Sequence, residues 1–316
     1  MLSIPKNVVL VYSDARENTR VSTDGFVPLV AEVDSAGTPI SWFFDTFLMT
    51  GLVTPSGRGF IHHGGELALR EEWDWFIDRM LGNGEQIKWL NDAVVNTAKV
   101  LKTSNTADIH RVNVILAIPY PASSGSCDNR LNLVKWYVDE TLKRVQSAGF
   151  TNINFIGYYW IAESWRKEAD GLIIPEVAKY VESKGYGLFW VPYSGAVVDG
   201  WKSLGFRNAM LQPNFAFRDV GLERFDEIEA LRQNHGLTIE LELASYTRGQ
   251  KMDWKHSFIE YCKAALRYGW NTKYPVGYYV GNTFVTYAKD KELFMYYRLI
   301  TKLVNGTLRL TDLDNL

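Results

Sequence analysis

The chain has 316 residues, of which 47% are hydrophobic and 22% are charged, a balance typical of a globular protein with a sizeable core. Its formal net charge of -2 supplies no basic surplus to attract a phosphate backbone, so we expect no nucleic-acid partner. The two cysteines, Cys127 and Cys262, are too few and too far apart for a disulfide framework or a zinc site.

No apolar run reaches the ~18 residues that a membrane span requires, so we expect none. The first residues lead directly into an apolar strand and lack the basic start and cleavage site of a signal peptide. These features fit either a cytoplasmic protein or a secreted domain present here without its signal. Aromatic residues make up 14% of the chain, which favours a site that stacks against flat sugar faces.

Eight short runs rich in β-branched or aromatic residues, each bounded by turn residues, predict eight strands. In chain order they are 8–13, 42–48, 112–118, 153–160, 187–191, 209–211, 237–243 and 276–280. Amphipathic stretches predict helices at 26–33, 67–81, 85–101, 131–148, before 183, and at 197–204, 222–234, 254–268 and 291–304.

Strands that alternate with helices indicate a parallel sheet, and eight is the number that closes a barrel. No glycine-rich phosphate loop follows the first strand, which argues against an open doubly wound sheet. We therefore predict an α/β fold, a single (β/α)8 TIM barrel over residues 1–308. An extended helical insertion follows the second strand, and 309–316 form a polar C-terminal tail.

The working site of such a barrel lies where its strands end. In the seventh strand, side-chain alternation directs Ile239 and Leu241 toward the helices, which places Glu240 and Glu242 inside the barrel. Ionised carboxylates in a dry interior are costly unless they are paired or used. A buried ion pair is the structural alternative for both residues.

Glu163 follows the strongly aromatic end of the fourth strand. Aromatic surroundings favour the neutral form of a carboxyl and raise its pKa, as a general acid requires near neutral pH. The alternative is a helix N-terminal glutamate favoured by the helix dipole.

A glutamate after strand four and another at the end of strand seven resembles the retaining (β/α)8 glycoside hydrolases. The resemblance implies that Glu163 is the acid/base and Glu242 the nucleophile. Ala162 stands where those enzymes usually carry asparagine, so the resemblance assigns no ligand to the sugar 2-hydroxyl. The pattern is also similar to uncharacterised barrel domains of bacterial surface proteins thought to act on polysaccharides.

Residues near the other strand ends are candidates for substrate contact. They are Asp14, Asp45, Tyr120, Trp160, Trp190, Tyr193, Gln212, Asn214, Glu240, Tyr279 and Asn282. The tryptophans would stack on sugar faces unless they belong to the core, and the polar groups would bind hydroxyls. Asp14 or Asp45 would replace Glu242 as the partner of Glu163 if Glu242 were structural.

The five histidines show neither an HxH nor an HExxH pattern, so we expect no metal and no other cofactor. The sequence therefore predicts a glycoside hydrolase that cleaves a polysaccharide or oligosaccharide with two carboxylates. A non-catalytic carbohydrate-binding barrel is one alternative. A barrel lyase or isomerase with Glu240 or Asp45 as its base is another.

Overall fold

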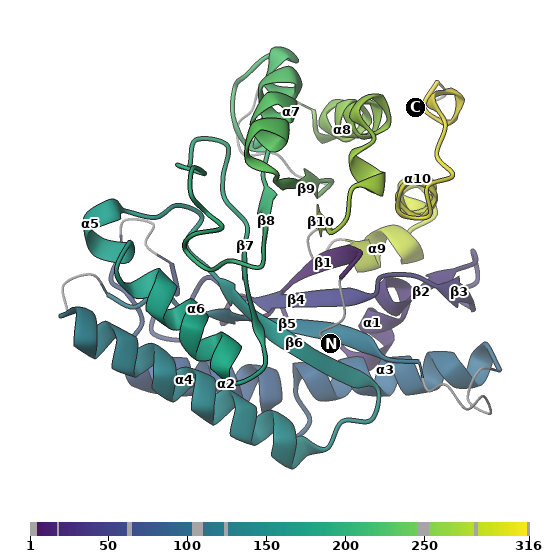
Figure 1. Cartoon of the computed structure of the whole chain (residues 1–316). Helices are drawn as coiled ribbons and strands as arrows, with labels where there is room; N and C mark the ends of the chain where they lie inside the picture. The colour runs from purple at the N-terminus through teal and green to yellow at the C-terminus, as the bar shows by residue number, and fades with distance from the viewer. Residues whose placement is uncertain are drawn as a thin grey trace.

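The computed structural model describes residues 5–17, 19–61, 65–102, 110–122, 126–244, 253–280 and 284–314. Eight parallel strands close into a barrel in the order β1-β10-β9-β8-β7-β6-β5-β4, which confirms the predicted TIM barrel (Figure 1). These strands are β1 (Asn7–Tyr12), β4 (Thr46–Thr50), β5 (Val112–Ile118), β6 (Ile153–Trp160), β7 (Gly187–Trp190), β8 (Asn208–Leu211), β9 (Thr238–Glu242) and β10 (Val276–Tyr279).

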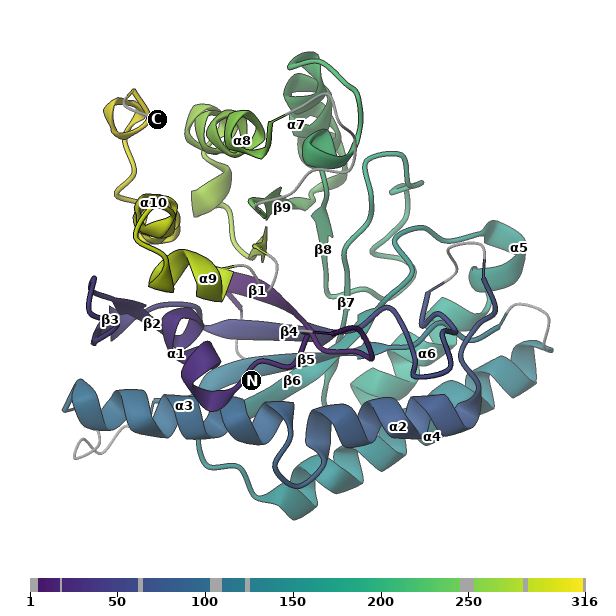
Figure 2. The ribbon, with the colours of Figure 1, turned by 180° about the vertical axis from the view of Figure 1, so that it is seen from behind.

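Helices surround the barrel. They are α1 (Thr23–Val30), α2 (Arg70–Leu81), α3 (Gln86–Val100), α4 (Cys127–Ala148), α5 (Lys167–Asp170), α6 (Ile173–Ser183), α7 (Glu223–His235), α8 (Trp254–Tyr268), α9 (Phe284–Lys289) and α10 (Phe294–Val304). Short 3-10 turns lie at Phe215–Phe217, Trp270–Thr272 and Leu310–Asp312. Figures 1 and 2 show α2, α3 and α4 along one side, with α7, α8 and α10 on the opposite side. In the part of the chain described, no helix is both long and apolar enough to cross a bilayer.

The barrel strands are buried almost throughout, because helices cover their outer face and side chains fill the interior. All five residues of β4 are buried, and six of the seven residues of β5 are buried. Parallel strands of this kind are apolar along their whole length rather than at every second residue. An exception inside the barrel, such as the pair of glutamates on β9, is therefore informative.

The structure differs from the sequence prediction between the first two barrel strands. Helix α1 ends at Val30, and β2 (Ala31–Val33) then pairs antiparallel with β3 (Pro39–Trp42), where the sequence predicts helix and the start of a strand. Asp34 drives the reversal, since its Oδ1 accepts hydrogen bonds from the backbone N–H groups of Ala36 and Thr38, each at 2.9 Å. The second barrel strand therefore begins at Thr46 rather than at residue 42.

Two segments near the surface also differ. Residues 197–204 form turns instead of the expected short helix, while α9 is a helix that the pattern does not predict. Near the C-terminus, Leu313 is buried in the core, and Lys302 Nζ lies 2.6 Å from Asp312 Oδ1. These contacts hold the end of the described chain against α10.

Candidate active site

A cavity of about 570 Å³ opens at the C-terminal end of the barrel. All eight barrel strands, or the loops that directly follow them, contribute to its wall. One lining residue from each, in chain order, is Tyr12, Leu52, Tyr120, Glu163, Tyr193, Gln212, Glu242 and Tyr279. The cavity thus lies where a barrel of this type carries its working site.

Two glutamates of β9 face this cavity. Glu240 lies beside Gly277 in the register with β10, and Glu242 lies beside Tyr279. A Cβ atom on Gly277 would approach the Cβ and Cγ of Glu240 to 3.2 Å, so this glycine leaves room for the base of the Glu240 side chain. Side chains two apart on a strand share a face, which is why both carboxyls enter one cavity.

Two neighbours hold the Glu242 carboxyl in place. Its Oε1 accepts a hydrogen bond from Asn214 Nδ2 at 3.1 Å, and its Oε2 accepts one from the Tyr261 hydroxyl of α8. Burial, reinforced by the charge of Glu163, raises the pKa of Glu242 to about 8, although the two donors act in the opposite direction. Glu242 is thus fixed in orientation and mostly neutral at pH 7.

Asn214 is itself positioned by its surroundings. Its backbone has a φ of 55°, in the left-handed region that asparagine tolerates better than most residues. Its Nδ2 also donates to Gln212 Oε1 at 3.0 Å, and its Oδ1 accepts from the backbone N–H of Ser194 at 2.7 Å. The loop after β8 therefore aims this amide at Glu242.

Glu240 lies deeper in the barrel, two residues before the end of β9. Its side chain is 2% exposed, and its Oε1 has no hydrogen-bond partner within the described part of the chain. Burial raises the pKa of Glu240 well above its usual range, and the neighbouring Glu242 and Glu163 raise it further. Burial at the cavity floor thus favours the neutral form of this carboxyl.

Glu163 stands at the mouth of the cavity, three residues after β6, and is only half-buried. Its backbone carbonyl accepts a hydrogen bond from the backbone N–H of Tyr193 at 3.1 Å, which joins the loops after β6 and β7. Its charge contributes to the raised pKa of both Glu240 and Glu242. Three carboxyls therefore lie within electrostatic reach of one another in a single cavity.

A buried ion pair supports the wall beside Glu163. Arg130 Nη2 of α4 lies 2.8 Å from Asp170 Oδ1, and both side chains are at least 95% buried. The Tyr120 hydroxyl donates to the same oxygen at 2.9 Å, and the backbone N–H of Arg166 donates to Asp170 Oδ2 at 3.0 Å. These bonds fix the loops that follow β5 and β6.

Several residues that the sequence predicts for the site do line the cavity. Besides the two proposed catalytic glutamates, they are Tyr120, Tyr193, Gln212, Asn214, Glu240 and Tyr279. Both functional groups of the Gln212 amide are occupied, because its Nε2 donates to the carbonyl of Val191 at 3.1 Å and its Oε1 accepts from Asn214. Asn282, also predicted, lies outside the described residues.

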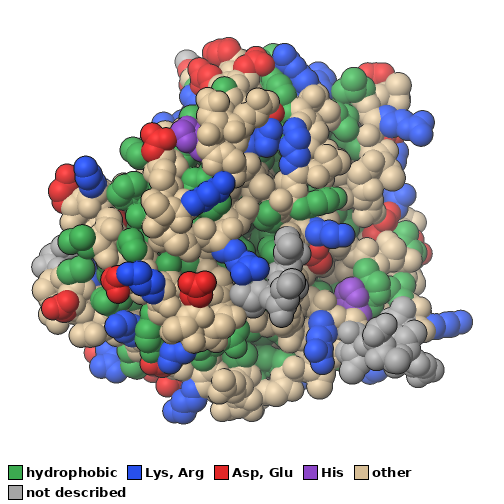
Figure 3. All heavy atoms as spheres, in the orientation of Figure 1, with side chains coloured by type: hydrophobic (Ala, Val, Ile, Leu, Met, Phe, Trp, Pro, Cys, Tyr) green, Lys and Arg blue, Asp and Glu red, His purple; other side chains and the backbone are tan. Residues whose placement is uncertain are grey.

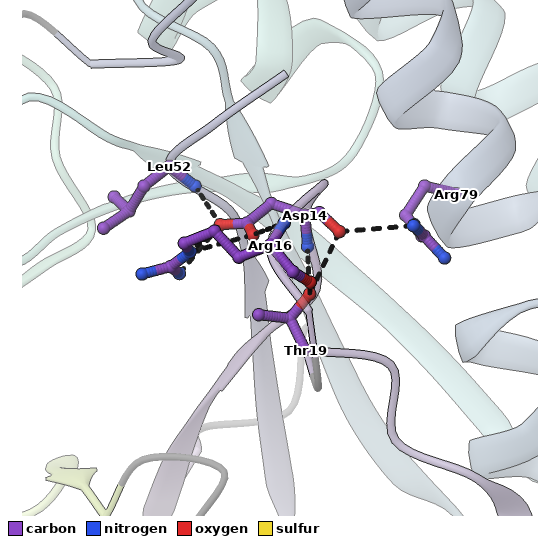
Figure 4. Close-up of polar contacts among 5 residues, drawn as sticks. All are labelled: Asp14, Arg16, Thr19, Leu52 and Arg79. Carbon is purple, nitrogen blue, oxygen red and sulfur yellow. Dashed lines mark hydrogen bonds and ion pairs between the residues drawn. The ribbon is translucent and has the colours of Figure 1, made fainter. Parts of the chain in front are cut away.

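Asp14 does not line the cavity, which corrects its predicted role as a substrate ligand. Its carboxylate is fully buried and accepts hydrogen bonds from Arg16 Nη2 at 2.8 Å and from the backbone N–H of Leu52 at 2.7 Å (Figure 4). The Thr19 hydroxyl donates to its main-chain carbonyl at 3.0 Å. Asp14 thus joins the loops after β1 and β4.

Asp45 is also corrected, because it lies at the wrong end of the barrel. It directly precedes β4, and its carboxylate oxygens accept from the backbone N–H of Lys6, just before β1, at 3.2 Å. The prediction fails because the second barrel strand begins later than its sequence pattern indicates. Asp45 is therefore neither a substrate ligand nor a base at the mouth.

The predicted tryptophan platforms belong to the core. Trp160 and Trp190 are 1% and 0% exposed, and neither lines the cavity. On β6 the neighbouring Tyr159 faces the cavity, so Trp160 points to the other face of the strand. Trp190 stacks on Phe206 with ring centroids 5.2 Å apart, and its Nε1 donates to the carbonyl of Ala162 at 2.8 Å.

Three aromatic residues that sequence reasoning missed line the cavity beside the predicted Tyr279, namely Tyr12, Tyr159 and Phe217. Tyr279 makes edge-to-face contacts with Tyr12 and with Phe217, each with centroids 5.7 Å apart. Strand alternation is a signal that could have identified Tyr12 and Tyr159. Two lining arginines, Arg166 and Arg218, were also missed because they lie in irregular loops with no pattern around them.

Comparisons with known proteins give one family and several structures of low similarity. The model of a family described as a domain of unknown function (DUF4855) matches residues 7–127 and 122–298. A mutant tryptophan synthase alpha-subunit from the hyperthermophile Pyrococcus furiosus is 10% identical, with 97% of this chain and 100% of that chain covered and a TM-score of 0.44. A family 18 chitinase from Crocus vernus is 9% identical, with 90% of this chain and 96% of that chain covered and a TM-score of 0.47. No curated protein matches the sequence.

Proposed function

The chain belongs to the DUF4855 family, and we propose from its site that it is a glycoside hydrolase acting on a polysaccharide or oligosaccharide. The observation that carries this proposal is the convergence of Glu163 and Glu242, from the ends of β6 and β9, on one open cavity. Two carboxyl groups flanking a bond are the minimal equipment for glycoside hydrolysis. The surrounding aromatic rings would supply faces for sugar rings.

We assign the acid/base role to Glu163 because it is half-exposed at the mouth. A general acid that gives its proton to the departing glycosidic oxygen must regain one in each cycle, and water reaches this position. In the second step the same carboxylate would take a proton from the attacking water.

We assign the nucleophile role to Glu242 because both of its oxygens accept hydrogen bonds, from Asn214 and Tyr261. Donors to both oxygens orient the carboxylate and favour its charged form. One oxygen would attack the anomeric carbon as the bond to the leaving oxygen breaks, giving a glycosyl ester that water then hydrolyses. Retention of configuration follows if the carboxyls stand about 5 Å apart across the substrate.

The proposed roles of Glu163 and Glu242 also predict how activity depends on pH. A nucleophile must be ionised, and the pKa of Glu242 in the empty cavity is about 8. Activity should therefore rise with pH through the region near that value. A substrate that donates hydrogen bonds to Glu242 would stabilise the carboxylate, so the rise in activity would occur at lower pH.

The test is hydrolysis of a panel of polysaccharides by the wild type, Glu163→Gln and Glu242→Gln. Each substitution keeps the shape of the side chain but removes the acid or the nucleophile. We expect kcat to fall by about 10³-fold or more in each variant. Glu176→Gln, at an exposed position on α6, is the matched control and should keep full activity. Undiminished turnover in both cavity variants would exclude the assignment.

A carbohydrate-binding barrel without hydrolytic activity is the second candidate. It is favoured by the raised pKa of both Glu240 and Glu242, since neutral carboxyls can hydrogen-bond hydroxyls without attacking them. Binding with no product release, at alkaline as well as neutral pH, would support this candidate over the hydrolase.

A further inference from the structure

Two arginines line the same cavity as the glutamates, Arg166 after β6 and Arg218 after β8. Both side chains are exposed, and neither forms an ion pair with a carboxylate in the described part of the chain. An exposed arginine on a convex surface needs no partner. Two arginines in one concave site, by contrast, are suited to binding an anionic ligand there.

Aromatic neighbours hold both guanidinium groups. Arg166 Nη2 donates a hydrogen bond to the Tyr120 hydroxyl at 3.1 Å. The guanidinium carbon of Arg218 lies 5.3 Å from the centre of the Tyr193 ring, within the range of a cation–π contact. Both tyrosines line the cavity, so the two cations are positioned along its wall rather than free in solvent.

In the described part of the chain the acidic side chains of the cavity form no ion pair with either arginine, although the charge of Asp170 contributes to the raised pKa of Arg166. Asp170 already has Arg130 as its buried partner at 2.8 Å. Burial raises the pKa of both Glu240 and Glu242, to about 8 for Glu242, which favours their neutral forms. Glu163 is the remaining acidic residue of the described lining.

Overall charge does not explain the two cations. The protein has a formal net charge of -2, and acidic and basic side chains are interspersed on the face shown in Figure 3. A local excess of positive charge in a concave, partly apolar site acts more strongly on a ligand than the same charge on an open surface.

From this arrangement we propose that the substrate is an anionic glycan, whose sugar units carry a carboxylate or a sulfate that binds Arg166 and Arg218. That the ligand is a glycan rests on the proposed function, and that it is anionic rests on the two arginines. Guanidinium groups present paired N–H donors that match the oxygens of such groups, which makes arginine well suited to this recognition.

The experiment measures binding rather than turnover, by titration calorimetry with three oligosaccharide sets of matched length: neutral glucans and mannans, uronate oligosaccharides, and sulfated oligosaccharides. The proteins are the wild type, Arg166→Gln, Arg218→Gln and the double variant. Arg207→Gln is the matched control, because Arg207 is also exposed but immediately precedes β8, at the opposite end of the barrel. Thermal unfolding of each variant checks that it is folded.

We expect the wild type to prefer an acidic set, with the uronate and sulfate arms identifying the group. Each arginine variant should weaken this binding by about 10-fold and lower its salt dependence, with Arg207→Gln unchanged. Arg166→Lys should recover only part of the affinity, since a lysine offers charge without the paired donors.

The inference is overturned if neutral sugars bind as well as acidic ones, if no acidic set binds, or if Arg207→Gln weakens binding as much as the cavity variants. The proposed recognition of an anionic glycan and the proposed hydrolase activity can fail independently of each other. Selective binding of an acidic glycan without cleavage would remove the proposed catalysis and keep the recognition. Cleavage of neutral glycans alone would do the reverse.

Discussion

At the scale of single residues, the ionisation of Glu242 decides when the proposed nucleophile can react. Burial favours its neutral form, whereas Asn214 and Tyr261 favour the carboxylate. The balance puts its pKa at about 8, so small changes in its hydrogen bonds should change activity near neutral pH. Neither donor lies on β9 itself, so each can be mutated without changing the proposed nucleophile.

Tyr261→Phe tests this balance. It removes the hydroxyl that donates to Glu242 Oε2, and with it a contribution that lowers the pKa of the carboxyl. The ascending limb of the pH profile of kcat/KM should therefore move to higher pH by about one unit, since a hydrogen bond to a charged group contributes roughly 1.5–3 kcal/mol.

The control for this measurement is Tyr137→Phe, at a fully buried tyrosine on α4 whose hydroxyl donates to the carbonyl of Ala117 at 2.8 Å. That variant should keep the position of the limb even if its stability falls. A Tyr261→Phe variant whose activity falls while the ascending limb of its pH profile stays in place would show that the hydroxyl does not tune the pKa of Glu242.

At the scale of elements, the site depends on helices and loops that lie outside the barrel strands. Helix α4 provides Arg130 to the buried Asp170, and α8 provides Tyr261 to Glu242. The ends of β6 and β9 that border the cavity are thus supported by helices that follow β5 and β9 in the chain. This connection couples the stability of the outer layer to the geometry of the cavity wall.

Arg130→Met tests the brace on Asp170. The substitution leaves a carboxyl that is 2% exposed without its partner, and removal of one member of a buried ion pair is strongly destabilising. We expect the free energy of unfolding in urea to fall by about 3 kcal/mol. The double variant Arg130→Met/Asp170→Asn should recover much of this loss, because it removes the isolated charge. Equal stability of the wild type and Arg130→Met would mean that the pair is not a structural support.

Sequence patterns were sufficient for the barrel and for the glutamates facing its interior, and the reasons are local. A strand such as β5 is apolar over its whole length, and alternation along β9 is enough to direct Glu240 and Glu242 inward. Asp45 was misplaced because the aromatic residues Trp42, Phe43 and Phe44, at the end of β3 and just before β4, resemble the start of a barrel strand. The sequence pattern alone does not show where the hairpin ends and the barrel strand begins.

The other parts of the site depend on contacts between distant segments. Tyr261 lies 19 residues after Glu242, and Asn214 lies 28 residues before it, so no spacing rule joins them. Arg166 and Arg218 occupy loops whose path follows from packing. The tryptophans at the ends of β6 and β7 were misjudged because composition suggests a stacking function, whereas burial shows a core function.

At the scale of the whole molecule, two neutral carboxyls inside the barrel affect stability as a function of pH. Their pKa values are raised by folding, from the usual 4.5 to about 8 for Glu242 and also upward for Glu240. A group whose folded pKa is raised contributes its full stability below the unfolded value and loses it as pH rises through the folded one. The folded state should therefore lose stability as the pH rises from about 4.5 to about 8.

Glu240→Gln isolates this effect, because the amide keeps the shape of the carboxyl but does not titrate. The wild type should lose thermal stability as pH rises over this range, and the variant should lose less, because its amide has no proton to release. Unfolding temperatures measured across the range for both proteins, with Glu176→Gln as an exposed control, provide the comparison. Parallel curves for the wild type and Glu240→Gln would mean that Glu240 is ionised in the folded barrel, and its charge would then oppose the binding of an anionic glycan.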